Sequence, residues 1–261
     1  ILVNGQGPFF NKLPVGQFSL EYVVTDACNN TSTCRTPIKV VDKATPNAVC
    51  NQFTKTSLDN NGFARVFAFT FDNGSTDNCA ILNYKVRKMV DVCGNNTAFG
   101  DYVDFCCAEL GTKQMVAFQV TDIYGNKNTC MVEVTVEDKI KPTITCPPNI
   151  TLACTDFYDV NHLDDFGKVV TKASDRKNVV VNNFYHNGIV GQDGLASDNC
   201  IVSVSQRYEL DIHCFTGQIR RIFIATDGGG RKDSCTQIIT ILNPDPFDES
   251  NITWPAHYQA D

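Results

Sequence analysis

The sequence predicts an all-β protein built from tandem immunoglobulin-like β-sandwich repeats. Three observations support this prediction: an internal repeat, short runs of alternating apolar and polar residues, and 13 cysteines in 261 residues. No stretch keeps the 3.6-residue period of an amphipathic helix over three turns. Modules with short strands, frequent turn residues and no helices are typical of β-sandwiches.

Three short motifs recur in the same order along the chain. The first is a strand that ends in Thr-Asp and is followed by a cysteine eight residues after the Asp. The second is the tripeptide Asp-Asn-Cys, and the third is an Asp-Lys pair shortly before a proline. Their copies are Thr25-Asp26 to Cys34, Thr121-Asp122 to Cys130 and Thr226-Asp227 to Cys235; Asp77-Asn78-Cys79 and Asp198-Asn199-Cys200; and Asp42 to Pro46 and Asp138 to Pro142. Motifs in a constant order indicate a true internal repeat.

The spacing of these motifs sets the predicted domain boundaries. Asp42 and Asp138 are 96 residues apart, and Asp138 and the equivalent Asn243 are 105 residues apart. We therefore predict the C-terminal part of one repeat at residues 1–42, complete repeats at 43–138 and 139–243, and a linker with the start of a further repeat at 244–261. On this interpretation both ends of the chain lie within an array.

The strands of each repeat are predicted from alternation. Residues 115–120 alternate in the period of two that is typical of a half-buried strand, and they lead into the Thr-Asp turn. Residues 132–136 and 236–241 alternate likewise after the turn. Gly125-Asn126 and Gly228-Gly229-Gly230 lie between these strands, where residues that tolerate positive φ favour a tight turn.

The middle copy also resembles a known family. It contains Thr121-Asp122, Gly125-Asn126 and Cys130, then Val134, Val136 and Asp138, and finally Pro142, Ile144 and Cys146-Pro147. This combination is similar to the hyalin repeat (HYR) in the tandem arrays of large cell-surface adhesins of Bacteroidota-type bacteria. The resemblance covers nearly the whole chain and implies an immunoglobulin-like fold and an adhesive or structural role without catalysis. Gly230-Arg231 departs from the usual Gly-Asn, and Cys106, Cys107 and Cys154 are additions.

The cysteines predict disulfides and an extracellular or cell-surface location, because no spacing has the C-x-x-C form of a zinc site. The first and last strands of a sandwich begin at the same end. Cys50 with Cys130, and Cys146 with Cys235, are therefore expected pairs, each stabilising by about 4 kcal/mol through loop closure. Matched spacing suggests Cys79 with Cys93 and Cys200 with Cys214, and proximity suggests Cys28 with Cys34.

Other connectivities remain open, because six cysteines allow fifteen pairings. Adjacent Cys106 and Cys107 are expected to bond to different partners, since a vicinal ring is strained. Cys154 is the leftover cysteine of its repeat, to be paired with another chain, paired outside this segment, or left as a buried free thiol.

Acidic residues are expected to gather where consecutive repeats meet. The first set is Asp42, Asp77, Asn78 and Asp122, and the second is Glu137, Asp138, Asp198, Asn199 and Asp227. Carboxylate and amide oxygens are the ligands that Ca²⁺ prefers, so calcium at the repeat junctions is one hypothesis. The alternative is that these side chains form Asx turns and cap strand ends.

Composition excludes several functions. The formal net charge is −7, which disfavours binding to nucleic acid or to anionic lipid. No apolar run approaches the ~20 residues of a membrane-spanning helix. The four histidines are scattered, and no nucleophile motif is present. The sequence therefore predicts a non-enzymatic protein.

The predicted function is a disulfide-stapled structural or adhesive segment of a large secreted surface protein or filament. Its expected partners are adjacent repeats, other copies in a fibre or homo-oligomer, and cell-surface glycans or proteins. Contacts are expected at insertions 94–113 and 155–195, where Phe157, Tyr158, Phe184 and Tyr185 lie. The alternative is a carbohydrate-binding or accessory module of a secreted enzyme.

Overall fold

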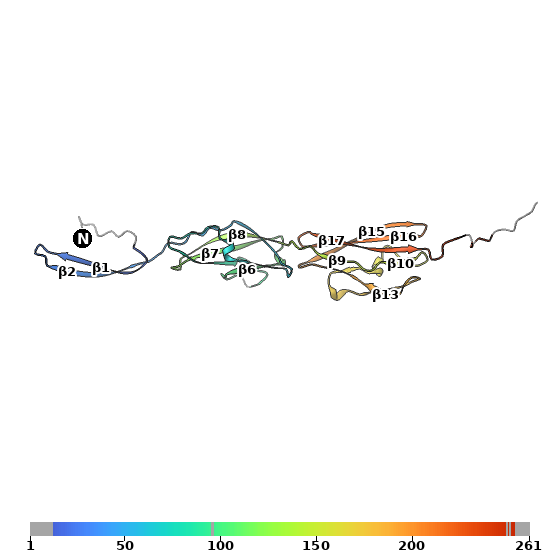
Figure 1. Ribbon diagram of the computed structural model, residues 1–261, viewed down its shortest axis with the longest axis horizontal. Coiled ribbons are helices and arrows are strands. Elements are labelled where there is room, and N and C mark those ends of the chain that lie inside the picture. Colours follow the sequence, from blue (N-terminus) through green and yellow to red (C-terminus); the bar gives the residue numbers. More distant parts are fainter. Residues whose placement is uncertain (1–12, 95–96, 249, 251, 254–261) are drawn as a thin grey trace, which may run out of the picture.

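The computed structural model describes residues 13–94, 97–248, 250 and 252–253. Its regular elements are strands and four short 3-10 helices, with no α-helix among the described residues. Figure 1 shows three groups of strands that follow one another along the long axis of the molecule. The prediction of an all-β chain of tandem immunoglobulin-like sandwiches is confirmed. Trp254 and Pro255, in the predicted start of a further repeat, lie outside the described residues.

The first group is a hairpin of β1 (Gly16–Thr25) and β2 (Thr31–Val40), paired antiparallel. Asp26 shapes its turn, because one carboxylate oxygen accepts from the backbone N–H groups of Cys28 and Asn30, both at 2.8 Å. Asn29 has φ +62° there, a conformation that Asn tolerates better than most residues.

The second group forms two facing layers. The larger sheet has the order β3, β8, β7, β5, and β3 runs parallel to β8 while the other pairs are antiparallel. The smaller layer pairs β4 with β6. The strands are β3 (Phe53–Ser57), β4 (Phe63–Phe67), β5 (Ile81–Lys88), β6 (Tyr102–Cys106), β7 (Lys113–Asp122) and β8 (Lys127–Glu137), with 3-10 turns η1 (Ala68–Phe71) and η2 (Cys107–Glu109).

The core of this group follows from the strand alternation. Phe71, Phe105 and Phe118 are fully buried between the layers, with Val116 and Val120 beside Phe118 on β7. Full burial of such a side chain stabilises by about 1.5–3 kcal/mol. The same period of two that predicted the strand therefore also identifies its inward face.

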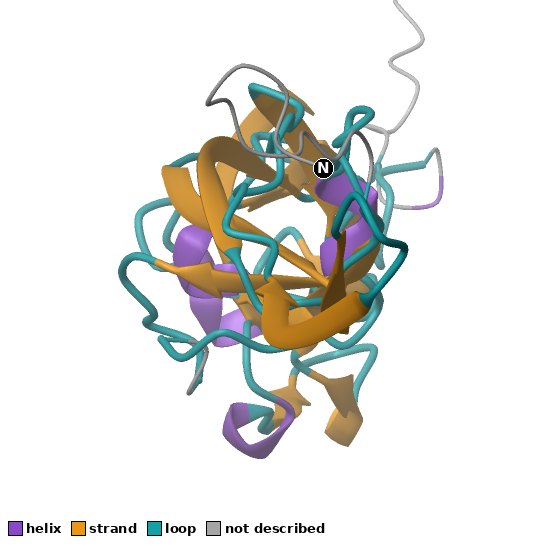
Figure 2. Cartoon of the chain, turned by 90° about the vertical axis from the view of Figure 1, so that its left-hand side faces the viewer, coloured by secondary structure: helices purple, strands orange, loops and turns teal. Residues whose placement is uncertain are grey.

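The third group repeats the larger sheet with the order β10, β17, β16, β15, and β10 again runs parallel to the last strand. A second layer contains β11, β14 and β9, and β12 and β13 form an added hairpin. The strands are β9 (Thr143–Thr145), β10 (Ile150–Ala153), β11 (Val169–Val170), β12 (Asn178–Asn182), β13 (Asn187–Gln192), β14 (Gly194–Ser197), β15 (Val202–His213), β16 (Thr216–Asp227) and β17 (Lys232–Leu242), with η3 (Leu163–Phe166) and η4 (Ala173–Asp175). Viewed along the long axis, the strand groups lie behind one another (Figure 2).

One buried cation in each complete sandwich anchors its irregular segments. In the second group the Lys88 ammonium lies 3.1 Å from Asp91 Oδ1 and 2.5 Å from Glu109 Oε1, and all three side chains are fully buried. Lys88 also donates to Asp104 O at 2.8 Å. These contacts satisfy its three donors and hold the segment after β5 against η2.

Four disulfides are present, and two join the expected pairs, Cys50 to Cys130 and Cys146 to Cys235. Each ties the start of a repeat to its last strand. The other two are different from the expected ones: Cys93 is bonded to Cys106, and Cys107 is bonded to Cys200. The remaining cysteines, all within the described residues, form no disulfide there; they are Cys28, Cys34, Cys79, Cys154 and Cys214.

The pairs Cys79 with Cys93 and Cys200 with Cys214 are wrong because their common spacing is the length of a strand. Cys79 precedes β5 and Cys93 follows it, and eight extended residues span about 26 Å. Cys200 and Cys214 lie on either side of the twelve-residue β15, which spans about 40 Å. Disulfide geometry needs Cα atoms within about 7 Å.

The pair Cys28 with Cys34 is also absent. Cys34 lies opposite Tyr22 within the β1–β2 ladder, whereas Cys28 lies in the turn beyond the last paired residues, Thr25 and Thr31. Cys130 and Cys235 occupy the same register as Cys34, opposite Phe118 and Phe223. Cys34 is therefore the counterpart of the two last-strand cysteines and not a staple of its own turn.

Candidate metal sites at the repeat junctions

The second junction brings three carboxylates together. Asp138 follows β8, Asp198 lies between β14 and β15, and Asp227 ends β16. One carboxylate oxygen from each lies within 4.8 Å of the other two. Asp138 is 5% exposed and Asp227 is 6% exposed, so two of the charges are almost fully removed from water.

Each of these carboxylates uses one oxygen to shape the local backbone. Asp138 Oδ1 accepts from the N–H of Ile140 at 2.9 Å, Asp198 Oδ2 from that of Cys200 at 3.1 Å, and Asp227 Oδ1 from that of Arg231 at 2.7 Å. The predicted Asx-turn role of these side chains is therefore present, but it occupies only half of each carboxylate.

The other oxygens have no hydrogen-bond partner among the described residues. They are Asp138 Oδ2, Asp198 Oδ1 and Asp227 Oδ2, together with Asn199 Oδ1, and all four are buried. Leaving a buried polar atom unpaired costs about 1–3 kcal/mol, so four of them in one place call for a ligand. Burial raises the pKa of Asp198; the N–H of Cys200 opposes this, and the charges of Asp138 and Asp227 add to it.

This donor set has the chemistry of a calcium site. Ca²⁺ takes six to eight oxygen ligands from carboxylates, amide and backbone carbonyls, and water. Three carboxylates and one amide oxygen supply half or more of that number and three negative charges, which a divalent cation would offset. The residues present therefore fit Ca²⁺.

The first junction has the same motifs but a different arrangement. Ligand atoms of Asp42, Asp77 and Cys79 lie within 4.8 Å of one another. Asp77 Oδ1 is buried and has no hydrogen-bond partner among the described residues, as is also true of Asn83 Oδ1 on β5. Asn78 Nδ2 lies 3.5 Å from both oxygens of Asp42. Asp122 is absent from this cluster.

Asn126 explains why Asp122 is not available. Its side-chain amide donates to Asp122 Oδ2 at 2.7 Å, and the backbone N–H groups of Tyr124 and Asn126 donate to Oδ1, both at 2.8 Å. Burial alone would raise the pKa of Asp122, but the hydrogen bonds from Asn126 lower it. Arg231 stands four residues after Asp227, where Asn126 stands four residues after Asp122, and no described residue caps Asp227 Oδ2.

Glu137 is not part of the acidic cluster. Its carboxylate lies 2.7 Å from Lys55 Nζ and 3.5 Å from Lys139 Nζ. The hydrogen bond and charge of Lys55 lower the pKa of Glu137. Glu137 ends β8 and pairs in register with Ser57 of β3, so it faces a surface lysine on that strand instead of the junction.

The second junction also has direct bonds between the two sandwiches. The Cys107–Cys200 disulfide joins η2 of the second group to the loop before β15 of the third. Asn199 Nδ2 donates to Asp59 O at 3.0 Å, across the same boundary. The sequence contains a signal for this bond: adjacent residues at the end of an extended strand point to opposite sides, so Cys106 and Cys107 cannot both face their own repeat.

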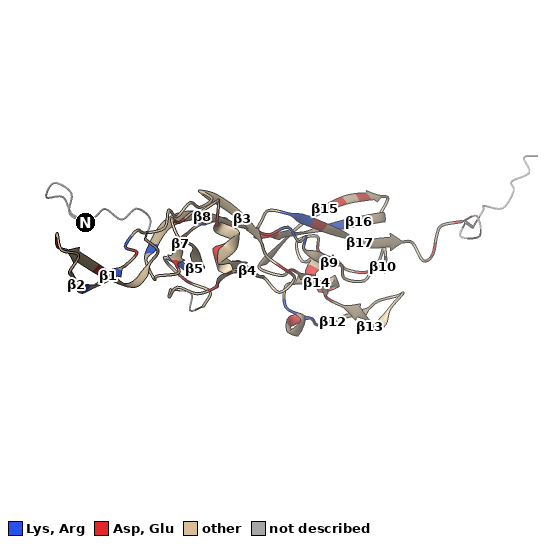
Figure 3. Ribbon diagram, turned by 60° about the vertical axis from the view of Figure 1, so that its left-hand side comes forward, with Lys and Arg blue, Asp and Glu red and all other residues tan. Residues whose placement is uncertain are grey.

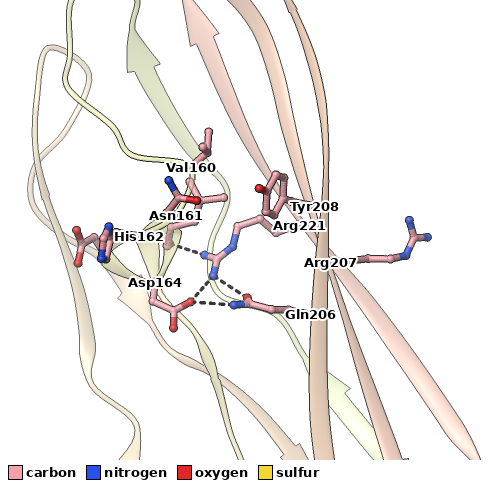
Figure 4. A pocket seen from close by; sticks show the side chains of 10 residues that line it. Val160, Asn161, His162, Asp164, Gln206, Arg207, Tyr208 and Arg221 are labelled. Carbon is pink, nitrogen blue, oxygen red and sulfur yellow. Dashed lines mark hydrogen bonds and ion pairs between the residues drawn. The ribbon is translucent and has the colours of Figure 1, made fainter.

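A cavity of about 340 Å³ beside Arg221 is a structural feature of the third group. Arg221 Nη1 donates to Leu163 O and Gly167 O, both at 2.7 Å. Its Nη2 donates to Asp164 Oδ1 at 2.7 Å and to Gln206 Oε1 at 3.0 Å (Figure 4). Burial lowers the pKa of Arg221, and Asp164 opposes that shift. The guanidinium is thus committed to holding η3 on the sheet, as Lys88 holds its own segment.

Charges elsewhere are mixed. Lys and Arg are interspersed with Asp and Glu along the strand groups (Figure 3). Across the described residues, no helix has the length and apolar character to cross a bilayer.

Comparisons with known proteins find similarity in solved structures. No family model matches the chain, and no curated protein matches it. The chain is similar to protocadherin gamma B7 extracellular cadherin domains 1–4, with TM-score 0.29, 13% identity and coverage of 87% of this chain and 58% of that chain. The protocadherin gamma B4 extracellular domain has TM-score 0.31 and 14% identity, with coverage of 87% of this chain and 37% of that chain. Protocadherin gamma C5 EC1-3 has TM-score 0.31 and 11% identity, with coverage of 86% of this chain and 77% of that chain. The chain thus spans less than two thirds of the first two proteins.

Proposed function

We propose that this chain is a non-catalytic, adhesive or structural segment of a large extracellular protein, built from HYR-type repeats at residues 43–138 and 139–243. The observation that carries the proposal is the second junction, where a disulfide and a buried acidic cluster join consecutive sandwiches. A joint of this kind restricts bending, which a load-bearing stalk requires. Disulfides that close loops of 80 and 89 residues further stabilise the two sandwiches.

Calcium is the cofactor that this proposal includes. Asp138, Asp198, Asn199 and Asp227 would hold it, with remaining positions filled by backbone carbonyls or water. When bound, the cation supplies the positive charge that offsets three neighbouring carboxylates. Without it, those charges repel one another and leave four buried oxygens unpaired.

The insertion in the third group is the surface that we propose for a protein or glycan partner. Phe157 is 92% exposed, and Phe184 is 69% exposed on the turn between β12 and β13. Phe184 stacks edge-on with Tyr185 at a centroid distance of 5.1 Å. Exposed aromatic side chains on a rigid scaffold are a common element of recognition surfaces.

The experiment is calcium titration calorimetry on the oxidised full chain, with Asp198→Asn and the matched control Asp77→Asn. These aspartates occupy equivalent places in the two Asp-Asn-Cys motifs. We expect one strong site in the wild type, loss of that site in D198N and its retention in D77N. Absence of binding by the wild type, or equal losses in both variants, would contradict the cation proposal.

The mechanical part of the proposal has a separate test. Small-angle X-ray scattering of the full chain, first with calcium and then with excess EDTA, reports length and flexibility. A stiff rod with calcium supports a stalk, and increased flexibility in EDTA supports a calcium-stiffened joint. A compact particle under both conditions would overturn the stalk itself.

A further inference from the structure

The disulfide between the sandwiches ends the same loop that carries two of the proposed cation ligands. Asp198 and Asn199 immediately precede Cys200, and Cys200 is bonded to Cys107 of the other sandwich. The loop is short, because β14 ends at Ser197 and β15 begins at Val202. Any constraint on the Cys200 sulfur therefore acts within one or two residues of both ligands.

We propose that the Cys107–Cys200 disulfide controls cation affinity at the second junction, so that reduction of this bond weakens cation binding and a bound cation protects the bond from reduction. This inference rests on the proposed cation site and adds a redox response to it. The two effects are thermodynamically reciprocal, because each stabilises the same loop conformation.

The neighbouring residues pack closely around the Cys107–Cys200 disulfide. Gly62, with φ +76°, lies against it, and a Cβ at this position would be 2.5 Å from Cys107 Sγ and 2.7 Å from Asn199 O. Cys107 Sγ itself lies 3.5 Å from Asn199 O. The backbone of the ligand-bearing residue therefore contacts both the sulfur and the glycine turn of the neighbouring sandwich.

The same loop is held by a weaker, non-covalent contact. Asn199 Nδ2 donates to Asp59 O at 3.0 Å and to Asp138 Oδ1 at 3.3 Å, so the amide links the neighbouring sandwich to the acidic cluster. When the disulfide opens, this polar contact must hold the loop against repulsion between Asp198, Asp138 and Asp227. A single hydrogen bond is much weaker than the covalent cross-link, so the open form samples conformations without the complete ligand set.

The redox step is an ordinary thiol–disulfide exchange with a dithiol. One thiolate of the dithiol attacks a sulfur of the pair and forms a mixed disulfide, and the other Cys leaves as a thiolate that takes up a proton. The second thiolate of the dithiol then attacks the mixed disulfide, which releases the other Cys and leaves the dithiol oxidised. Both cysteines are only partly buried, so a small dithiol can reach them.

The test uses the oxidised full chain after alkylation of its exposed free thiols, Cys28, Cys34, Cys79 and Cys214. Calcium affinity is measured by calorimetry for the wild type and for the Cys107→Ser/Cys200→Ser double variant, with Cys93→Ser/Cys106→Ser as the control within one sandwich. We expect the C107S/C200S variant to bind calcium about fivefold more weakly or worse, and the control to match the wild type.

A second measurement needs no variant. Dithiothreitol is added to the wild type with calcium or with EDTA, and alkylation followed by peptide mass spectrometry reports when each disulfide opens. Calcium should slow opening of Cys107–Cys200 and leave the opening of Cys93–Cys106 unchanged. Equal calcium affinities of the wild type and the C107S/C200S variant, or equal opening rates of Cys107–Cys200 in calcium and in EDTA, would overturn the redox inference while the cation proposal stands. Absence of calcium binding by the oxidised wild type would overturn both.

Discussion

The two repeat junctions contain the same motifs, yet the structure arranges them differently. Both have an aspartate after the last strand, an Asp-Asn-Cys loop and an aspartate at the Thr-Asp turn. At the first junction Asn126 donates to Asp122 Oδ2, so both oxygens of that carboxylate accept hydrogen bonds. At the second, Arg231 follows Asp227 at the equivalent place and Oδ2 has no partner among the described residues. The residue four positions after the turn aspartate thus decides whether that carboxylate is closed by a hydrogen bond or keeps a free oxygen.

The covalent bond is the second difference. Cys200 reaches Cys107, whereas Cys79, its counterpart in the motif, is an exposed free thiol. Burial of the acidic group and cross-linking of the two sandwiches therefore occur at the same junction. The comparison teaches that equal sequence motifs produce a cross-linked joint only where the neighbouring repeat supplies the matching cysteine.

The largest expected effect comes from the glycine beneath the inter-repeat disulfide. Gly62→Ala should destabilise the chain by about 2–4 kcal/mol, because its Cβ meets backbone and sulfur at a positive φ. Gly74→Ala is the matched control, since Gly74 has φ +88° and nothing within 4 Å. It should cost only about 1 kcal/mol. Urea unfolding measures both, and equal losses would show that the packing around the disulfide is loose.

Replacing Arg231 by the asparagine found at the equivalent place, Asn126, should make the second junction resemble the first. Arg231→Asn introduces an amide that can donate to Asp227 Oδ2, as Asn126 does for Asp122, so calcium affinity should fall about tenfold, the value of roughly one hydrogen bond. Arg231→Ala is the control, because it removes the same positive charge without supplying a donor. Calcium calorimetry compares the two variants, and R231N binding as tightly as R231A would contradict this account of the junctions.

The pH dependence of stability should have opposite signs at the two junctions in EDTA. The pKa of Asp198 is raised above 3.8, so its ionised form costs stability near pH 7, and the cost disappears as the pH falls through the raised folded-state value. The pKa of Asp122 is lowered, so its ionised form adds stability above 3.8 that is lost as the pH falls through the lowered value.

Substitution at pH 7 in EDTA should therefore raise the melting temperature for Asp198→Asn and lower it for Asp122→Asn, each by about 2–4 °C. The difference in melting temperature between D198N and the wild type should shrink as the pH approaches 4. Differential scanning calorimetry at both pH values measures this. A lower melting temperature for D198N at pH 7 would mean that the ionised group is stabilised by a partner.

The smallest effect is expected at Glu137. Glu137→Gln should leave calcium affinity within about twofold of the wild type, because its carboxylate faces Lys55 in an exposed ion pair, and such pairs contribute little. Calorimetry alongside D198N gives the contrast directly. A loss of affinity comparable to that of D198N would place Glu137 back among the ligands.

The alternation of residues 115–120 predicted both the strand and its buried face, because side chains on extended backbone alternate between the two sides. The position of Cys50 and Cys130 at one end of the sandwich predicted their pairing for a similarly general reason. The matched spacing from Cys79 to Cys93 does not indicate a disulfide, because a regular interval also arises from the length of a strand that separates its ends.

Local period, turn residues and repeat spacing therefore determined the all-β fold and its tandem order, since each depends on residues close together in the chain. Only the tertiary structure decided that Cys107 meets Cys200, 93 residues away, and that four oxygens from three separate segments remain unpaired together. Both depend on how one sandwich is placed against the next, and that placement results from packing between surfaces whose contacts no single segment encodes.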